Sequence, residues 1–324
     1  MSRIASAAVS AVLIISGALA SPAVGSTVHT WQVQAGSLAG FDAGGPTGGG
    51  NQFYPERIAI HAGDSITFTP LGPHTVTFNR PPVPVFALLA PPFITPSPAT
   101  ISSPTDSVSA PIGFEFPPHP YTLTFAASLP PGAYKIICGL HIGMSETVDV
   151  LPASAALPKT DADYAAIAQA EITRELDQLD QTASNAVKDN QGQDGDTTVS
   201  VGAGNEHGSI IRFFPSALTI HVGQSVTFVK RKDPTEPHTV NFATPDDMIL
   251  ELLPWGGATY PAAGFTASGL MVTHPQFDYY HLAGTGLPDG VLNYRLTFTA
   301  PGDFSYFCAI HDEAGMRATI HVIP

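Results

Sequence analysis

The feature that most constrains this chain is an internal similarity between its two halves. Residues 53–68 align without gaps on residues 213–228, at an offset of 160. A Pro-His-Thr-Val match follows, beginning at Pro73 and at Pro237, and each half then reaches a Cys-x-x-His motif near its end. Self-similarity of this kind predicts two tandem copies of one domain. A chain of 324 residues has room for two domains of ordinary size.

The shared segments also indicate the fold class. Ile58 and Ile60, matched by Leu218 and Ile220, alternate with polar positions before a Gly-centred turn. This period of two is typical of half-buried antiparallel strands. Charged residues make up only 12% of the chain, and its 30 Gly and 31 Pro are frequent without reaching the level of a disordered protein. We therefore expect an all-β protein in which each half is a small sandwich of short strands.

Residues that bind metals recur together with these strands. The candidate ligands are His74, Cys138, His141 and Met144 in the first half, and His238, Cys308, His311 and Met316 in the second. In each half the Cys, the second His and the Met fit one loop that curls back on itself, and the distant His closes the site. A thiolate, two imidazoles and a weak axial thioether form a donor set that suits copper in electron transfer. Zinc could use the same ligands, but structural zinc sites more commonly contain several cysteines.

Each of these residues has a simpler interpretation when it is taken alone. A single Cys is usually a small buried hydrophobe, and a single His or Met is usually a packing residue. Two cysteines in an exported protein would ordinarily form a disulfide. The same set recurs in the same order at matched positions in both halves, and this recurrence favours two metal sites over a Cys138–Cys308 disulfide.

Both halves resemble cupredoxins, the type 1 blue copper family of plastocyanin, amicyanin and azurin. The resemblance covers residues 26–152 and 197–324, with a Cys138 to Met144 spacing similar to amicyanin and a longer Cys308 to Met316 spacing similar to plastocyanin. It implies two tandem Greek-key cupredoxin β-sandwiches, each with the four residues named above as ligands of one type 1 copper ion. It further implies single-electron transfer with redox partner proteins outside the cytoplasm, through a second His that lies near the surface.

The two spacings between Cys and Met also lead to a hypothesis about redox properties. Axial ligation and the surroundings of the thiolate tune the potential of a copper site. Since the two loops differ in length, we expect the two sites to have unequal reduction potentials.

Residues 153–196 differ in character from the two halves that they join. From residue 161 to about residue 188, apolar side chains recur at steps of four and three, which predicts one amphipathic helix. Thr160 is a possible N-cap, with Asp163 three residues later. Because isolated helices of this length are marginally stable, we expect the helix to pack on one or both sandwiches and residues 189–196 to be an exposed linker. Its apolar positions are Tyr164, Ala168, Ile172, Leu176, Leu179, Ala183 and Ala186.

Three other segments lack the regular strand pattern. Residues 80–120 contain twelve prolines and cannot supply central strands. The corresponding stretch of the second half runs from Trp255 to Tyr280, and we interpret both stretches as excursions laid over the sandwiches. The Gly-rich run at residues 44–50 is expected to be a flexible loop.

The start of the chain predicts export. Arg3 precedes an apolar run at residues 4–17, and Ala18-Leu19-Ala20 is a small-x-small cleavage site, so residues 1–20 fit a secretory signal peptide. An uncleaved membrane anchor fits less well because the run is short for a span. We therefore expect a periplasmic or extracellular protein without a membrane span after cleavage. The net charge of −14 argues against nucleic acid as a partner.

Copper enzymes are the main alternative function. Two-domain cupredoxin enzymes, such as nitrite reductases and small laccases, hold an additional copper between domains and need extra histidines for it. Here Ile137 and Phe307 precede the two cysteines, and no His-x-His pair occurs among the twelve histidines. The sequence therefore predicts an electron-transfer protein and not an enzyme, with a copper carrier or buffer as a further alternative. The histidines left as possible ligands of an interdomain copper are His29, His119, His207, His274 and His281.

Overall fold

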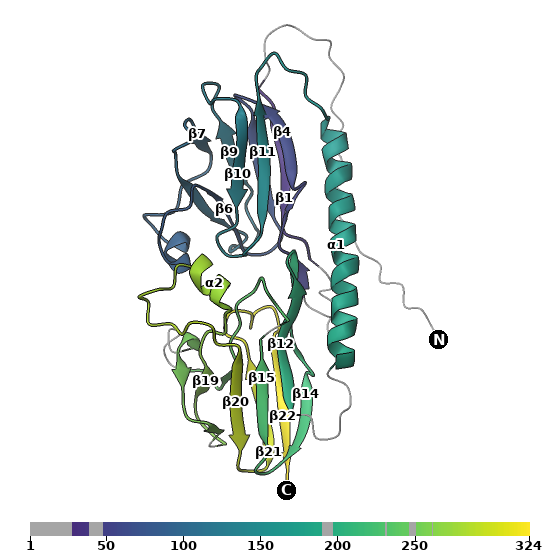
Figure 1. The fold of residues 1–324 in the computed structure, drawn as a ribbon, viewed down its shortest axis with the longest axis vertical. Coiled ribbons are helices and arrows are strands. Elements are labelled where there is room, and N and C mark those ends of the chain that lie inside the picture. Colours follow the sequence, from purple (N-terminus) through teal and green to yellow (C-terminus); the bar gives the residue numbers. More distant parts are fainter. Residues whose placement is uncertain (1–27, 39–47, 190–196, 231, 246–250, 261) are drawn as a thin grey trace, which may run out of the picture.

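A computed structural model describes residues 28–38, 48–189, 197–230, 232–245, 251–260 and 262–324. Within these ranges the chain forms two β-sandwiches placed end to end, with one long helix along their side (Figure 1). The predicted signal peptide at residues 1–20 lies outside the described residues, as do residues 190–196 of the linker predicted at residues 189–196. The domain limits at residues 26, 152, 153, 196, 197 and 324 stay predictions.

The first sandwich consists of two five-stranded sheets. One sheet has the order β3 (Phe53–Tyr54), β1 (Thr30–Ala35), β5 (Ser65–Pro70), β9 (Tyr121–Phe125) and β7 (Ala99–Ile101). The other has the order β4 (Arg57–His61), β11 (Ser145–Leu151), β10 (Gly132–Ile137), β6 (His74–Phe78) and β8 (Val108–Ile112). Side chains alternate between buried and half-buried along β11, as the period of two predicts, so each sheet turns one apolar face toward a shared core.

The second sandwich repeats this arrangement with two six-stranded sheets. One has the order β18 (Thr259–Tyr260), β20 (Asn293–Phe298), β15 (Ser225–Val229), β12 (Thr198–Asn205), β13 (Gly208–Phe214) and β2 (Gly48–Gly50). The other has the order β14 (Ala217–His221), β22 (Arg317–Ile323), β21 (Gly302–Phe307), β16 (Asn241–Phe242), β19 (Thr266–Ser268) and β17 (Pro254–Trp255). In both halves the strand of the first shared segment pairs in parallel with the last strand, β4 with β11 and β14 with β22. The expected fold class, two Greek-key β-sandwiches joined by a helix, is confirmed.

Strand β2 connects the two sandwiches and corrects one expectation. Gly48–Gly50 was expected to lie in a flexible loop, but it pairs antiparallel with β13 of the second sandwich, with Gly49 opposite Ser209. A strand made of glycine has no side-chain alternation, so the sequence gives no sign of it. The glycines are needed because a Cβ atom on Gly49 would lie 1.9 Å from the carbonyl oxygen of Ser37.

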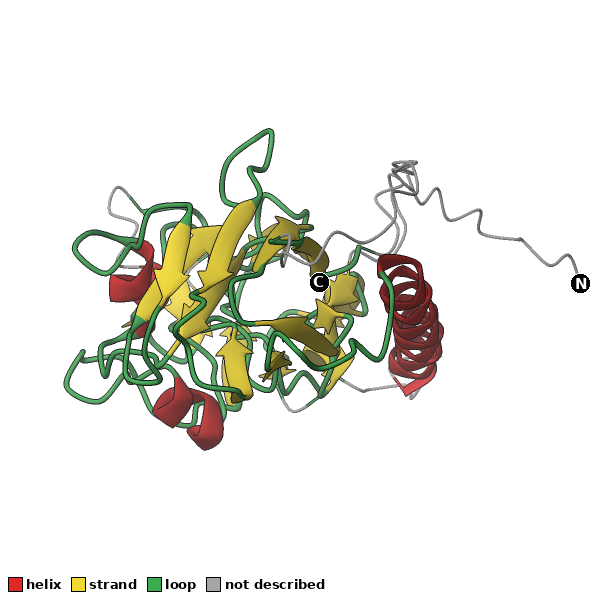
Figure 2. Cartoon of the chain, turned by 90° about the horizontal axis from the view of Figure 1, so that it is seen from above, coloured by secondary structure: helices red, strands yellow, loops and turns green. Residues whose placement is uncertain are grey.

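The connecting segment forms the predicted helix, α1 (Asp161–Asp189). Thr160 and Asp163 cap its start reciprocally, since the Thr160 hydroxyl accepts from the Asp163 amide and the Asp163 carboxylate accepts from the Thr160 amide. Tyr164 belongs to the core of the first sandwich, whereas Leu179 and Ala186 pack with residues of the second. The expectation that the helix packs on the sandwiches is confirmed, and α1 flanks both on one side (Figures 1 and 2).

The two irregular stretches lie partly at the junction between the sandwiches. The Pro-rich stretch supplies only β7 and β8, which are edge strands as its prolines require, and the 3-10 helix η1 (Val85–Leu89). The corresponding stretch of the second half contains a short helix that the sequence analysis did not predict, α2 (His274–Tyr279). It begins with a capping box between Thr273 and Gln276 and has Pro275 in its first turn. Both η1 and α2 lie near the junction in Figure 1.

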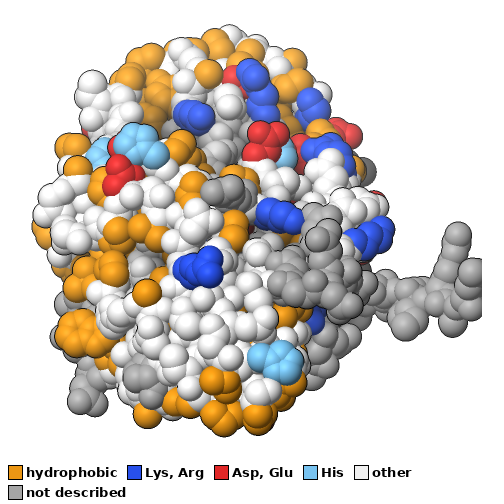
Figure 3. Space-filling model, turned by 60° about the horizontal axis from the view of Figure 1, so that its bottom comes forward, with side chains coloured by type: hydrophobic (Ala, Val, Ile, Leu, Met, Phe, Trp, Pro, Cys, Tyr) orange, Lys and Arg blue, Asp and Glu red, His pale blue; other side chains and the backbone are white. Residues whose placement is uncertain are grey.

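The surface fits the low charge content of the chain. Uncharged and apolar side chains cover most of the face in Figure 3, with scattered Lys and Arg. No helix within the described residues is both long and apolar enough to cross a membrane.

Candidate metal centres

The loop between β10 and β11 carries three of the candidate ligands of the first half. The amide of Cys138 donates to the carbonyl of Met144 (3.1 Å), and the amide of Met144 donates to the carbonyl of His141 (3.2 Å), so the loop curls back on itself. His74 is the first residue of β6, which is paired with β10. The sheet therefore places the distant His beside the loop.

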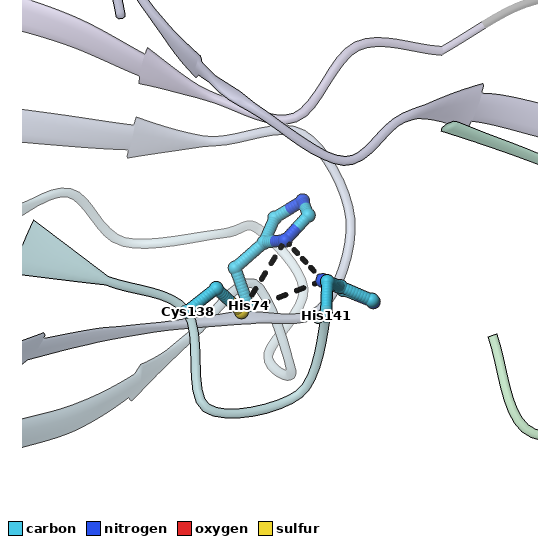
Figure 4. A group of neighbouring side chains, drawn as sticks. All are labelled: His74, Cys138 and His141. Carbon is cyan, nitrogen blue, oxygen red and sulfur yellow. Dashed lines mark hydrogen bonds between the residues drawn. The ribbon is translucent and has the colours of Figure 1, made fainter. Parts of the chain in front are cut away.

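The side chains of His74, Cys138 and His141 converge on one point (Figure 4). The Cys138 sulfur lies 3.4 Å from Nδ1 of His141 and 3.9 Å from Nδ1 of His74, and the two Nδ1 atoms are 2.9 Å apart. All three residues are buried, and Cys138 is fully so.

The second half repeats this geometry between β21 and β22. The Cys308 sulfur lies 3.5 Å from Nδ1 of His311 and 3.8 Å from Nδ1 of His238. The amide of Cys308 donates to the carbonyl of Met316 (3.0 Å), as its counterpart does in the first half. Both cysteines are free, so the structure contains no Cys138–Cys308 disulfide.

The sulfur-to-nitrogen distances fit a first-row transition metal ion. An ion about 2.3 Å from a thiolate sulfur and about 2.0 Å from an imidazole nitrogen separates the two by about 3.7 Å in a trigonal plane. The four sulfur-to-nitrogen distances lie between 3.4 and 3.9 Å. Met144 and Met316 are buried in the same apolar clusters as Cys138 and Cys308. The residues present therefore fit a copper ion with a thiolate and two imidazoles, and a thioether belongs to each surrounding cluster.

A threonine follows the first His in both halves and supports the Cys from two sides. The amides of Thr75 and Thr239 each donate to the cysteine sulfur, at 3.3 Å in both sites. Their hydroxyls accept from the amide after the Cys, at 2.6 Å from Gly139 and 2.8 Å from Ala309. An N–H donor directed at the sulfur stabilises its thiolate form, so each Thr both positions the loop and favours the ligating state.

One carboxylate distinguishes the second site from the first. Oδ2 of Asp233 lies 2.8 Å from Nε2 of His238, and both side chains are fully buried. Burial alone would lower the pKa of His238, but Asp233 and the Cys308 thiolate outweigh burial and raise it. Burial lowers the pKa of His74, and Cys138 and Glu236 oppose only part of this shift. Asp233 thus holds His238 with Nδ1 directed at the sulfur.

A second carboxylate, Glu236, lies between the two sites. Its Oε1 is 2.9 Å from Nε2 of His141 in the first sandwich, and its Oε2 is 3.5 Å from Nε2 of His311 in the second. Burial alone would raise the pKa of Glu236, but the two imidazoles outweigh burial and hold it well below its ordinary value. Burial alone would likewise lower the pKa of His311, but Cys308 and Glu236 raise it to about 10.

Comparison with known proteins identifies the family of this chain. A plastocyanin of Scenedesmus fuscus is 31% identical over 127 residues, which are 39% of this chain and 99% of that protein. The model of the copper-binding proteins of the plastocyanin/azurin family matches residues 198–323. This chain belongs to the plastocyanin/azurin family. Its members are cupredoxins, and the assignment supports copper binding and electron transfer as the general function of this one.

Solved cupredoxin structures also match this chain. Oxidised plastocyanin from the fern Dryopteris crassirhizoma is 19% identical, covering 39% of this chain and 99% of its own, with a TM-score of 0.24. A Cu(I) amicyanin mutant is 20% identical, covering 41% of this chain and 87% of its own, with a TM-score of 0.24.

The position of the second His in each site differs from what the cupredoxin resemblance implied. That His was expected near the surface, but His141 is only 7% exposed and the side chain of His311 only 11%. Each imidazole faces the other half of the chain across Glu236. In this cupredoxin the two sites therefore face each other across the junction.

Four of the five histidines left as possible ligands of an interdomain copper have other partners. His29 pairs with Asp161, His274 with Asp289, and His207 with Gln52. His119 is exposed beside Glu115, and His281 is a surface residue with a positive φ. Within the described residues, only the two Cys-His-His groups bring three metal-ligating side chains together.

Asp233 and Glu236 were not predicted, although the sequence contains a signal for them. The shared segments are offset by 160 residues up to Phe68 and Phe228, but by 164 residues at Pro73 and Pro237. The second half therefore has four additional residues directly before its first His, and both carboxylates lie in this longer loop. A change of offset beside a candidate ligand indicates a loop that differs between the two halves and can carry residues found at only one site.

Proposed function

We propose that this chain is an exported two-site blue copper protein that transfers single electrons, with one type 1 copper in each domain. The observation that carries the proposal is the recurrence of one buried Cys-His-His group, with the same Thr and Met residues, in each sandwich. The expected ligands are His74, Cys138, His141 and Met144 in one site, and His238, Cys308, His311 and Met316 in the other.

Copper bound at these ligands supplies a one-electron couple between Cu(I) and Cu(II). The protein contributes a ligand set whose positions are held by hydrogen bonds outside the site. The threonines fix the cysteine loops, and the surrounding strands exclude water from the sulfur atoms, which are fully buried. A site held in this way limits rearrangement between the two oxidation states, which favours rapid electron transfer.

The alternatives have less support. A copper oxidoreductase would need a further metal, and the described residues offer no third group of ligands. A copper carrier or buffer would need ligands that release the metal quickly, whereas three ligands of each site are nine-tenths buried or nearly so. Competition with a copper chelator separates these functions, because an electron carrier should release its copper slowly.

The first test is the metal content of the full chain together with its visible spectrum. We expect two copper ions per chain and an intense blue absorption from thiolate-to-copper charge transfer. Cys138→Ser and Cys308→Ser should each remove one copper ion and the corresponding part of the blue band. A colourless copper-treated protein would contradict the proposal, and a third copper ion without added blue intensity would favour the oxidoreductase.

Export is tested separately from copper binding. The proposed cleavage after Ala20 predicts that the protein outside the cytoplasm begins at Ser21. The mass of the intact secreted protein measures this directly. An uncleaved Met1 in the mature protein would contradict the proposed signal peptide.

A further inference from the structure

The two candidate copper sites are connected by a continuous series of polar contacts of 2.9 to 3.5 Å. In each site the Nδ1 atom of the second His faces the cysteine sulfur, and the Nε2 atom faces Glu236. The connection therefore runs from Cys138 and His141 through the Glu236 carboxylate to His311 and Cys308. Since Nδ1 faces the metal position in both rings, Nε2 carries the proton that Glu236 accepts.

The surroundings of Glu236 keep it in this position. Nδ2 of Asn51, which follows β2, donates to Oε1 of Glu236 at 2.9 Å. The Asp233 carboxylate accepts from the Glu236 amide at 3.0 Å. The Glu236 side chain is therefore held by both sandwiches and by its own loop, and it is only 6% exposed.

Apolar and aromatic residues close the junction around this connection. Val85 of η1 packs in one buried cluster with Leu270, Val272, Tyr280 and Leu282 of the second half. The hydroxyl of Tyr279 donates to the carbonyl of Cys138, so the second half also contacts the first cysteine directly. The second His of each site therefore has little exposed surface, 7% for His141 and 11% for the side chain of His311.

We propose that the two sites exchange electrons with each other inside the chain, through His141, Glu236 and His311. This inference rests on the proposed function, because it requires copper in both sites. In the exchange, Cu(I) in one site is oxidised to Cu(II) and Cu(II) in the other is reduced to Cu(I). One electron moves, no covalent bond forms or breaks, and no further reactant is needed.

Glu236→Gln is the variant that tests the connection. A carboxylate accepts one N–H from each imidazole, whereas the amide group of Gln has a single acceptor oxygen and two N–H donors. The variant keeps the size of the side chain but can accept an N–H from only one of the two imidazole rings. Glu206→Gln is the matched control, because it removes a carboxylate from the same half whose side chain is 85% exposed.

The measurement is the redistribution of a single electron in the fully copper-loaded chain. A laser or radiolysis pulse delivers less than one electron per chain, and rapid-freeze EPR then follows each Cu(II) signal. The two signals are assigned from Cys138→Ser and Cys308→Ser. In the native chain we expect redistribution whose rate is independent of protein concentration. Glu236→Gln should slow this phase several-fold, and Glu206→Gln should leave it unchanged.

Two results would overturn the inference: no redistribution in the native chain, or the same rate in Glu236→Gln. Both differ from failure of the proposed function, in which the native chain lacks two blue copper centres before any electron is delivered. The copper and the blue band of Glu236→Gln show whether that variant is folded and loaded.

A second readout does not depend on electron transfer. In the diamagnetic Cu(I) protein, ¹⁵N NMR should show slowly exchanging Nε2 protons on both His141 and His311. Glu236→Gln should weaken this protection on at least one ring. Rapid exchange of both protons in the native protein would contradict the bridge.

Discussion

At the scale of single residues, Asp233 and Glu236 hold imidazoles of the two Cys-His-His groups in place. Cys-x-x-His beside a distant His is a pattern of residue types, and its recurrence makes it specific. Asp233 acts instead through a three-dimensional contact with His238, and Glu236 acts on residues of both sandwiches. The Asp233 contact joins two residues five positions apart in one loop, whereas the Glu236 contact with His141 depends on how the two domains meet, which local sequence patterns do not encode.

Asp233 provides the first prediction at this scale. Besides His238, its carboxylate accepts from Ser209 and from the amides of Thr235 and Glu236. Asp233→Asn should lower the copper affinity of the second site by about 10- to 100-fold and raise its reduction potential, since outer carboxylates strengthen the imidazole ligand. Chelator competition and redox titration of each site measure both effects.

The control is Asp303→Asn, because Asp303 also pairs with a His of the second half but is exposed. We expect it to leave the affinity and the potential unchanged. An equal loss of affinity in both variants would show that Asp233 acts only through general charge.

Glu175 provides a second prediction, which concerns pH. It lies on α1, is 5% exposed and accepts a hydrogen bond from Tyr54. Burial raises its pKa to about 7, although the Tyr54 hydrogen bond opposes part of this shift. The folded protein therefore binds this proton more tightly than the unfolded chain does, so stability falls as the pH rises from about 4.5 to about 7.

The expected change is measured as a difference between Glu175→Gln and the native chain. The variant cannot ionise, so its free energy of unfolding relative to the native chain should increase by about 3 kcal/mol between pH 4.5 and pH 8. Chemical denaturation of the metal-free proteins at several pH values measures this difference. Asp177→Asn, which removes an exposed carboxylate from the same helix, controls for loss of charge. A difference independent of pH would contradict the role of Glu175.

At the scale of elements, the helix and the strands whose apolar side chains recur at regular steps were predicted. The elements without such a pattern were not. The apolar steps and the Thr160 cap predicted α1, and alternation predicted the shared strands. Strand β2 has only glycines, so its pairing with β13 comes from backbone hydrogen bonds and close packing alone. Helix α2 was missed because the Thr273 to Gln276 capping box lies inside an otherwise irregular stretch.

The close packing of β2 gives a prediction for this scale. Gly49→Ala should destabilise the protein by about 1–3 kcal/mol, because the new Cβ atom would collide with the Ser37 carbonyl and force the backbone to shift. The shift should also displace Asn51 from Glu236. Thermal and chemical unfolding measure the first effect, and the Nε2 protons of His141 and His311 report the second.

Gly257→Ala is the control, since a Cβ atom there would meet no atom within 4 Å. We expect it to change stability by much less. If both variants are equally stable, β2 does not hold the junction as tightly as the structure indicates.

At the scale of the whole molecule, the two Cys-His-His groups are alike in their residues and unlike in their surroundings. Asp233 pairs with His238, and no carboxylate in the described part of the chain pairs with His74, so we expect His238 to be the stronger donor to a bound copper ion. A stronger donor favours Cu(II), so we expect the second site to have the lower reduction potential. The first electron added to the oxidised protein should therefore reside mainly on the first site.

Redox titration followed by EPR measures this distribution. The signal of the first site should disappear before that of the second, and Asp233→Asn should narrow the interval between them. Equal potentials, or reduction of the second site first, would contradict the prediction.

The loop that carries Glu236 also determines which assemblies could reproduce the junction. An exact twofold axis between identical halves would require each half to contribute the same groups to the interface. Here the carboxylate of Glu236, which belongs to the second half, contacts one imidazole of each half. A symmetric dimer of the second half would bring two carboxylates to this place, and a dimer of the first half would bring none. A single covalent chain with two unequal halves therefore places one carboxylate acceptor between two imidazole donors.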